Sequence, residues 1–142
     1  MRGKPRTHWL NAGGGLPCNI GYCNGEKALR AQWVKLTDDA FEEPYCDDNG
    51  ARVWAFHNPK DGLYRTYLIC VKYDDNLTWP MIAAMVAHEA VHVAQFLWEA
   101  IGEEKPGNET EAYFVQSIVQ EVLEAIGMPE RPAPDTTQGN KP

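Results

Sequence analysis

The stretch Leu77–Ile101 most constrains the fold of this chain, because it is largely apolar and contains the pattern His-Glu-x-x-His. We expect a single helix that begins near Thr78, a residue suited to the N-cap, and that ends at Gly102. Pro80 is compatible with this helix because it falls in the first turn. A helix that is apolar on nearly all sides is usually buried, so we expect this one to lie in the core.

The polar residues of the pattern are His88, Glu89 and His92. His88 and His92 are four residues apart and therefore share one helix face, where both imidazoles can point at one metal ion. Zinc suits this arrangement because it accepts neutral imidazole nitrogens and keeps a position open for water. Glu89 lies about 100° around the helix from His88, which lets its carboxylate take a proton from such a water. The alternative is that the three side chains are satisfied by hydrogen bonds and have no chemical role, but polar groups in a buried helix cost free energy unless they are paired or bound to metal.

The chain has 142 residues, and we expect one domain over residues 1–131, with an irregular Gly-rich segment at 1–17 and a tail at 132–142. The formal net charge is −7, and an acidic surface opposes sequence-independent binding of nucleic acid. Arg2, Lys4 and Arg6 make the N-terminus locally basic, and we interpret this segment as a disordered or partner-held tail.

No apolar segment follows the basic N-terminus, so we expect no signal peptide. We also expect no membrane span, which would need about 20 consecutive apolar residues. The four cysteines form no Cys-x-x-Cys pair, so a cysteine zinc site is not expected. A Cys18–Cys23 or a Cys46–Cys70 disulfide is an alternative, but without an export signal we expect free thiols.

Other segments can be assigned from their spacing. Residues 24–36 predict a helix with Asn24 as its N-cap, and an acidic loop follows at residues 38–50. Residues 51–57 and 63–73 predict two strands, joined into a hairpin by turn residues at 58–62.

A final helix is predicted over Asn108–Ile126, and Gly127 and Pro129 end it. Its apolar stripe has helical spacing and consists of Val115, Ile118, Val119, Val122, Leu123 and Ile126. The short connection before it makes the last two helices antiparallel neighbours. The fold class is therefore α+β, with a β-hairpin or small antiparallel sheet packed on the two helices.

Two histidines do not complete a zinc site, and the start of the final helix offers Glu109 and Glu111 as a third ligand. Measured from the centre of the apolar stripe, Glu111 lies about 50° away and Glu109 about 110° away. Periodicity alone therefore favours Glu111, while the other carboxylate would be one that the helix dipole favours near an N-terminus.

The motif His88-Glu89-x-x-His92 followed by Glu109 resembles the gluzincin group of zinc peptidases, in which a glutamate on a later helix completes the site. The segment from Glu109 to Tyr113 is similar to the E-x-x-A-D/N pattern of several gluzincin branches, in which the first glutamate is the ligand. The resemblance implies a zincin-like fold and one zinc per chain, held by His88, His92 and Glu109.

The segment departs from the gluzincin pattern at Tyr113, where those branches carry Asp or Asn. A hydrogen bond from that position to a histidine is therefore in doubt, and Tyr113 is a candidate to act on the oxyanion instead. The pattern also predicts that Ala112 makes the closest contact between the two helices. Tyr73, Tyr67 and His57 are the other oxyanion candidates.

Several segments together resemble small phage-encoded metallopeptidase-like proteins: Trp9–Asn11, Ile20–Cys23, Glu26–Ala28, His88–Val93 and Glu109–Tyr113. The resemblance implies a zinc metallopeptidase with Glu89 as general base and a peptide or protein as substrate, located in the host cytoplasm or the virion. By analogy of fold, the strand at residues 63–73 is expected to pair as an edge strand with an extended substrate. The rival interpretation is a virion or host-interaction protein in which zinc is structural and the tails bind the partner.

Overall fold

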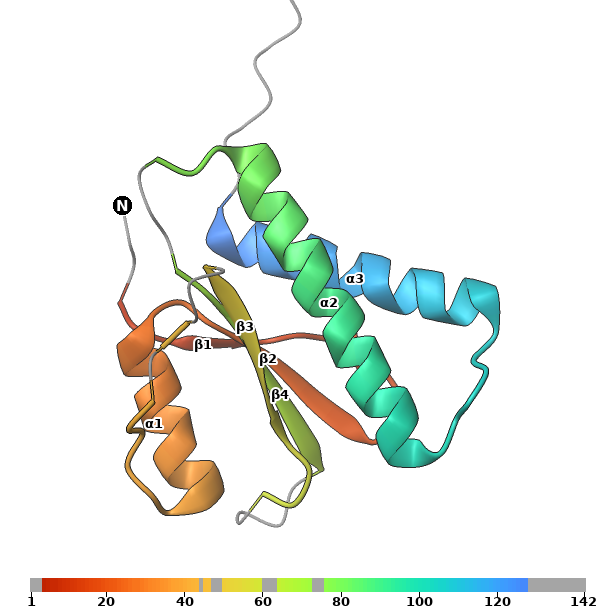
Figure 1. The fold of residues 1–142 in the computed structure, drawn as a ribbon, viewed down its shortest axis with the longest axis horizontal. Helices are drawn as coiled ribbons and strands as arrows, with labels where there is room; N and C mark the ends of the chain where they lie inside the picture. The colour runs from red at the N-terminus through yellow and green to blue at the C-terminus, as the bar shows by residue number, and fades with distance from the viewer. Residues whose placement is uncertain (1–3, 44, 47–49, 60–63, 73–75, 128–142) are drawn as a thin grey trace, which may run out of the picture.

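A computed structural model describes residues 4–43, 45–46, 50–59, 64–72 and 76–127 of the chain. The described chain has an α+β architecture in which a sheet lies between one helix on one face and two helices on the other (Figure 1). Its elements are β1 (Thr7–Trp9), β2 (Cys18–Cys23), α1 (Glu26–Thr37), β3 (Ala51–Phe56), β4 (Arg65–Val71), α2 (Trp79–Ile101) and α3 (Asn108–Ile126).

The sheet has four strands in the order β1-β2-β4-β3 and is mixed rather than antiparallel. The predicted hairpin is confirmed, since β3 and β4 pair antiparallel. The expected antiparallel sheet is wrong at its centre, because β2 and β4 run parallel. The expectation that residues 63–73 form an edge strand is also wrong: β4 lies between β2 and β3, and β3 is the edge strand on that side.

Two strands lie where the sequence predicts irregular chain or no element. β1 falls inside the segment 1–17, and β2 follows directly after it. In β2 the alternate residues Cys18, Ile20 and Tyr22 face the core under α2 and α3, whereas Cys23 faces the core under α1. Gly21 between them hides the pattern, because a glycine weakens strand propensity. A Cβ at Gly21 would lie 2.9 Å from the Thr7 side chain of β1 and 3.1 Å from the Leu68 side chain of β4. These neighbouring side chains lie so close to β2 that position 21 requires glycine.

The helices agree closely with the predicted ranges. Thr78 caps α2 by accepting a hydrogen bond at Oγ1 from the Met81 N–H at 3.4 Å, and Gly102 ends the helix in the left-handed region at φ 74°. Gly127 ends α3 in the same way at φ 85°. The prediction that Asn24 caps α1 is wrong, because its Oδ1 accepts from the Arg6 N–H at 2.8 Å and so ties down the N-terminal segment instead.

The two faces of the sheet carry two separate cores. One core lies under α1 and includes Leu29, Phe41 and Trp54. The other lies between the sheet, α2 and α3 and includes Tyr67, Val93 and Ile118. α3 runs back obliquely across α2, as the short connection predicts, and both helices cover the same face of the sheet (Figure 1). The larger core therefore fixes the position of α2, which carries the His-Glu-x-x-His motif.

α2 is long and apolar enough by composition to cross a membrane, with a mean hydropathy of 1.2 over 18 residues, of which 44% are buried inside the structure. A core helix of a globular domain meets the same criterion. The buried part of α2 packs against the sheet and α3.

Candidate metal and catalytic site

The two histidines of the motif meet on the surface of α2. His88 Nε2 and His92 Nε2 are 3.0 Å apart, and their rings are inclined at 78°. In a tetrahedral zinc site, two nitrogens at about 2.0–2.1 Å from the metal are about 3.3 Å from each other. The pair therefore fits a zinc ion with only a small opening of the two rings.

One face of α2 is more open than the sequence predicts. The expectation of a helix buried on all sides is wrong, because His88 is exposed, His92 is half-buried and Val91 keeps 39% of its surface exposed. The reason is the packing: the sheet and α3 cover two adjoining sides of α2, and nothing among the described residues covers the side that carries His88. A metal held by the histidines would thus be accessible to a substrate.

Two residues further along α2 contact His92. The Nδ1 of His92 lies 3.1 Å from Gln95 Oε1, and the ring of Phe96 stacks on the imidazole at 6.0 Å between centroids. Gln95 is not among the residues predicted from the sequence, although its spacing of three residues from His92 places the two side chains next to each other on a helix. These contacts hold the imidazole plane on the side of the helix that faces His88.

Glu89 occupies a different environment from the histidines. It is buried, with 6% of its surface exposed, and its carboxylate accepts a hydrogen bond from the backbone N–H of Val53 in β3. Burial raises the pKa of Glu89, while the adjacent His88 and His92 and the Val53 N–H lower it less. A carboxylate with a raised pKa that lies beside two imidazoles has the properties of a general base.

The carboxylates at the start of α3 do not lie with His88, His92 and Glu89. Glu109 is exposed and Glu111 is half-buried, as the periodicity of the apolar stripe predicts. The expectation that Ala112 makes the closest contact between the helices is wrong: Ala112 is exposed, and Phe114, which the predicted stripe omits, packs on Trp98 at 5.5 Å. Tyr113 keeps 62% of its surface exposed, on the side of α3 away from the core.

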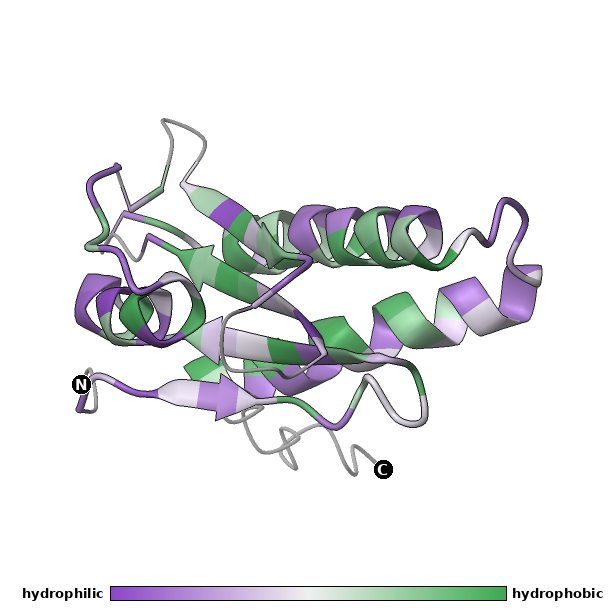
Figure 2. Cartoon of the chain, turned by 90° about the horizontal axis from the view of Figure 1, so that it is seen from below, coloured by the Kyte–Doolittle hydropathy of each residue, from purple (hydrophilic) through white to green (hydrophobic). Residues whose placement is uncertain are grey.

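The geometry of α2 explains this separation. Six residues turn a helix through about 600°, so His92 and Trp98 point about 120° apart. Trp98 faces α3 through Phe114, whereas His92 faces the flank that carries Glu89 and β3. Figure 2 shows the start of α3 as a hydrophilic end of the molecule beyond the apolar contact of the helices.

Within the described residues, no group of three or more His, Cys, Asp or Glu side chains is placed to hold a metal. His88 and His92 are in direct contact, Glu89 lies near enough for their charges to lower its pKa, and Glu109 is exposed at the start of α3. The assignment of Glu109 as the third ligand stays a prediction of the resemblance, and the exposure of Glu109 at the start of α3 argues against it.

The remaining oxyanion candidates have little access to the histidines. Tyr67 is fully buried and its hydroxyl has no hydrogen-bond partner among the described residues, and burial raises its pKa to about 12. His57 is exposed at the end of β3 and contacts Tyr67 edge-on at 5.9 Å. Tyr73 lies outside the described residues.

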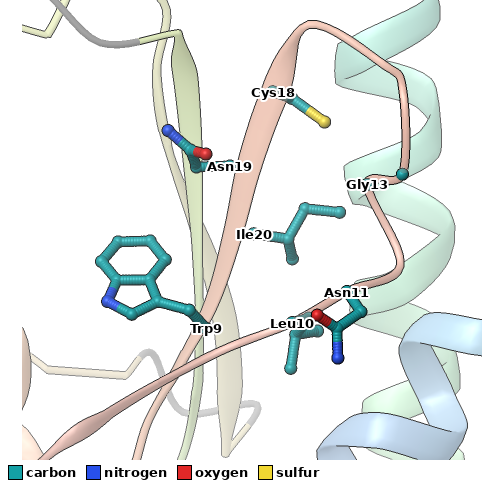
Figure 3. Close-up of a pocket in the computed structure, with 8 residues that line it drawn as sticks. Trp9, Leu10, Asn11, Gly13, Cys18, Asn19 and Ile20 are labelled. Atoms are coloured by element: carbon teal, nitrogen blue, oxygen red, sulfur yellow. The ribbon is translucent and has the colours of Figure 1, made fainter.

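A hollow of about 450 Å³ lies at the β1–β2 end of the sheet and is lined by β1, the Gly-rich segment and β2 (Figure 3). Its lining includes Trp9, Asn11, Cys18 and Ile20, and no carboxylate or imidazole is among the lining residues. Burial raises the pKa of the Cys18 thiol to about 11, so this sulfur is protonated at neutral pH and is a poor nucleophile.

All four cysteines are free, as expected, and buried. Neither alternative disulfide forms, and Cys23 in β2 instead lies in register with Cys70 in β4. Burial raises the pKa of Cys70 well above its ordinary range, so its sulfur is protonated at neutral pH. Cys23, Cys46 and Cys70 belong to the core under α1, whereas Cys18 belongs to the core between the sheet, α2 and α3.

Comparison of the chain with protein-family models, with curated proteins and with solved structures finds no match. The functional argument therefore depends on the geometry of α2 and its neighbours.

Proposed function

We propose that this chain is a zinc-dependent hydrolase, and that its substrate is a peptide or protein. The observation that carries the proposal is the 3.0 Å separation of His88 Nε2 and His92 Nε2, with the Glu89 carboxylate beside them. Two imidazole nitrogens this close together on one helix face, with a carboxylate on the adjoining side of the helix, supply two of the three protein ligands and the general base that metal-assisted hydrolysis uses.

Each residue has a separate task in this proposal. His88 and His92 bind the metal through their Nε2 atoms. Bound zinc would polarise the scissile carbonyl and lower the pKa of water. Glu89 takes the proton from the attacking water and passes it to the leaving amine, because its raised pKa lets it hold that proton between the two steps.

The edge of β3 supports a polypeptide substrate. The Lys72 N–H donates to the Gly50 carbonyl. The backbone N–H and C=O groups of even-numbered residues in β3 therefore point toward β4, and those of odd-numbered residues point away from the sheet. The Val53 N–H accordingly donates to Glu89, and the backbone of Ala55 faces outward as well. An extended peptide that pairs with this edge would place its carbonyl groups next to Glu89 and the histidines.

The rival structural role has weaker support. A structural zinc site is closed by four protein ligands, whereas His88 is exposed and leaves the histidine pair open to solvent. The phage origin and the location in the host cytoplasm or virion that the resemblance implies stay predictions.

The test is the zinc content of the purified protein and of two variants. We expect about one zinc per wild-type chain, as in other sites of this type, and little zinc in His88→Ala and His92→Ala. His57→Ala is the matched control, because His57 is exposed but lies at the end of β3 outside the pair, and it should keep its zinc. Equal zinc in the wild type and both α2 variants would contradict the proposal. Zinc bound in a site that cleaves no protein in a host-cell lysate would favour the structural role.

A further inference from the structure

Gln95 holds one end of a chain of hydrogen bonds that runs through both histidines. Its Oε1 lies 3.1 Å from His92 Nδ1, and His92 Nε2 lies 3.0 Å from His88 Nε2. The three side chains project from successive turns of α2, so their order is set by the helix alone.

The chemistry of an amide oxygen decides where the protons in this chain lie. An amide oxygen can only accept, so the bond to Gln95 requires the proton of His92 on Nδ1. A neutral imidazole with its proton on Nδ1 has a bare lone pair on Nε2. The contact between the two histidines then requires that His88 donates from its Nε2–H to His92 Nε2.

We propose that Gln95 is a positioning residue that fixes His92 in the Nδ1–H tautomer and so presents its Nε2 lone pair for metal binding. The ring of Phe96, stacked on His92 at an interplanar angle of 20°, restrains the same imidazole against rotation. The tautomer assignment depends only on the hydrogen-bond geometry of Gln95, His92 and His88, whereas its consequence for zinc rests on the proposed function. His92 is thus prepared for metal, while His88 must move its proton from Nε2 when a metal enters.

The opposite orientation of the Gln95 amide makes a distinct prediction. If the amide nitrogen pointed at His92 it would donate to Nδ1, and the imidazole proton would lie on Nε2. His92 would then donate to His88, and the ring that needs rearrangement on metal binding would be His92. The two arrangements can be told apart by the position of one proton.

The first experiment locates that proton in the metal-free protein. Long-range proton–nitrogen NMR spectra, recorded at about pH 8.5, well above the ordinary imidazole pKa of about 6.5, should show His92 protonated on Nδ1. On addition of zinc, the protonated nitrogen should stay the same for His92 and change from Nε2 to Nδ1 for His88. A metal-free His92 protonated mainly on Nε2 would overturn the proposal, whether or not the protein binds zinc.

The second experiment measures zinc affinity by competition with a chromophoric chelator. Gln95→Met keeps the length of the side chain but removes the acceptor, and we expect affinity to fall about 10- to 100-fold, as for other partners of metal-binding histidines. Gln95→Glu keeps an acceptor and should stay within a few-fold of the wild type. Gln120→Met is the matched control, since Gln120 is exposed on α3 and donates to Glu124 at 3.0 Å, away from the histidines.

The outcomes separate this proposal from the proposed function. Wild-type protein that binds no zinc contradicts the proposed function and leaves the tautomer to be decided by NMR. Wild-type protein that binds zinc, with Gln95→Met equal to it in affinity, overturns the role of Gln95 alone. Thermal unfolding of the metal-free variants should match the wild type, because Gln95 is exposed and its loss exposes no core.

Discussion

Glu89 lies between a strand and the histidine pair of α2. The Val53 N–H fixes its carboxylate at the edge of β3, while His88 and His92 lie beside it on α2. Burial alone would favour its neutral form, and the hydrogen bond and the histidines favour its charged form. The residue can therefore exchange a proton at moderate cost, which a purely structural carboxylate would not need.

Replacement of Glu89 by Gln tests this role at the scale of one residue. Gln has the same shape and can still accept from the Val53 N–H, so the fold and the zinc content should be kept. Hydrolysis of a peptide substrate should fall at least about 10²- to 10⁴-fold, because the base is lost. Zinc analysis and kcat/KM measured on the same preparation check this. Glu99→Gln, an exposed site on the same helix, is the control, and an active Glu89→Gln enzyme would contradict the mechanism.

The packing of α3 and the resemblance to gluzincins lead to opposite expectations for Glu109. The resemblance implies that Glu109→Ala loses zinc more than Glu111→Ala. The packing implies that neither variant loses much, because the start of α3 faces the flank of α2 that carries Trp98. We expect the second result, since moving α3 to the other flank would expose the contacts of Phe114 and Ile118. Zinc content that falls in either variant would show that α3 can reach the histidines.

At the same scale, β3 can be tested as the strand that pairs with substrate. Ala55→Pro removes one outward N–H, and proline is tolerated on an edge strand when that N–H does not face its partner strand. We expect zinc binding to stay unchanged and kcat/KM for a long peptide to fall about 2- to 10-fold, the value of one hydrogen bond. Ala55→Ser keeps the N–H and is the control, and circular dichroism confirms the fold. Unchanged hydrolysis by a folded Ala55→Pro would exclude pairing at this edge.

Zinc binding should raise the free energy of unfolding of the whole molecule. The histidine pair is already formed in the folded chain, so a metal that binds it raises the free energy of unfolding by about 2.7 kcal/mol at 100 times Kd. Thermal unfolding with and without zinc measures the effect, and the His88→Ala, His92→Ala double variant should show none. Binding of zinc to the four cysteines in the unfolded chain would reduce the gain. An equal gain in the double variant would place the metal elsewhere.

Local patterns in the sequence are enough to predict where α2 and α3 begin and end. Thr78 and Gly102 bound α2, and Asn108 and Gly127 mark the ends of α3 as predicted, because caps and helical periodicity depend on neighbours a few residues apart. The convergence of His88 and His92 follows from the same short-range geometry. The hairpin of β3 and β4 is equally local, since turn residues join the two strands.

The features that only the tertiary structure decides are contacts between residues far apart in the sequence. β2 pairs parallel with β4 across a separation of more than 40 residues, and this pairing places β4 inside the sheet and leaves β3 at its edge. The contact of Glu89 with Val53, the exposure of His88 and the distance of Glu109 from both histidines depend on which flank of α2 meets the sheet and which meets α3. Periodicity identifies an apolar side of each helix, but the choice of neighbour for that side is made by packing of the whole core.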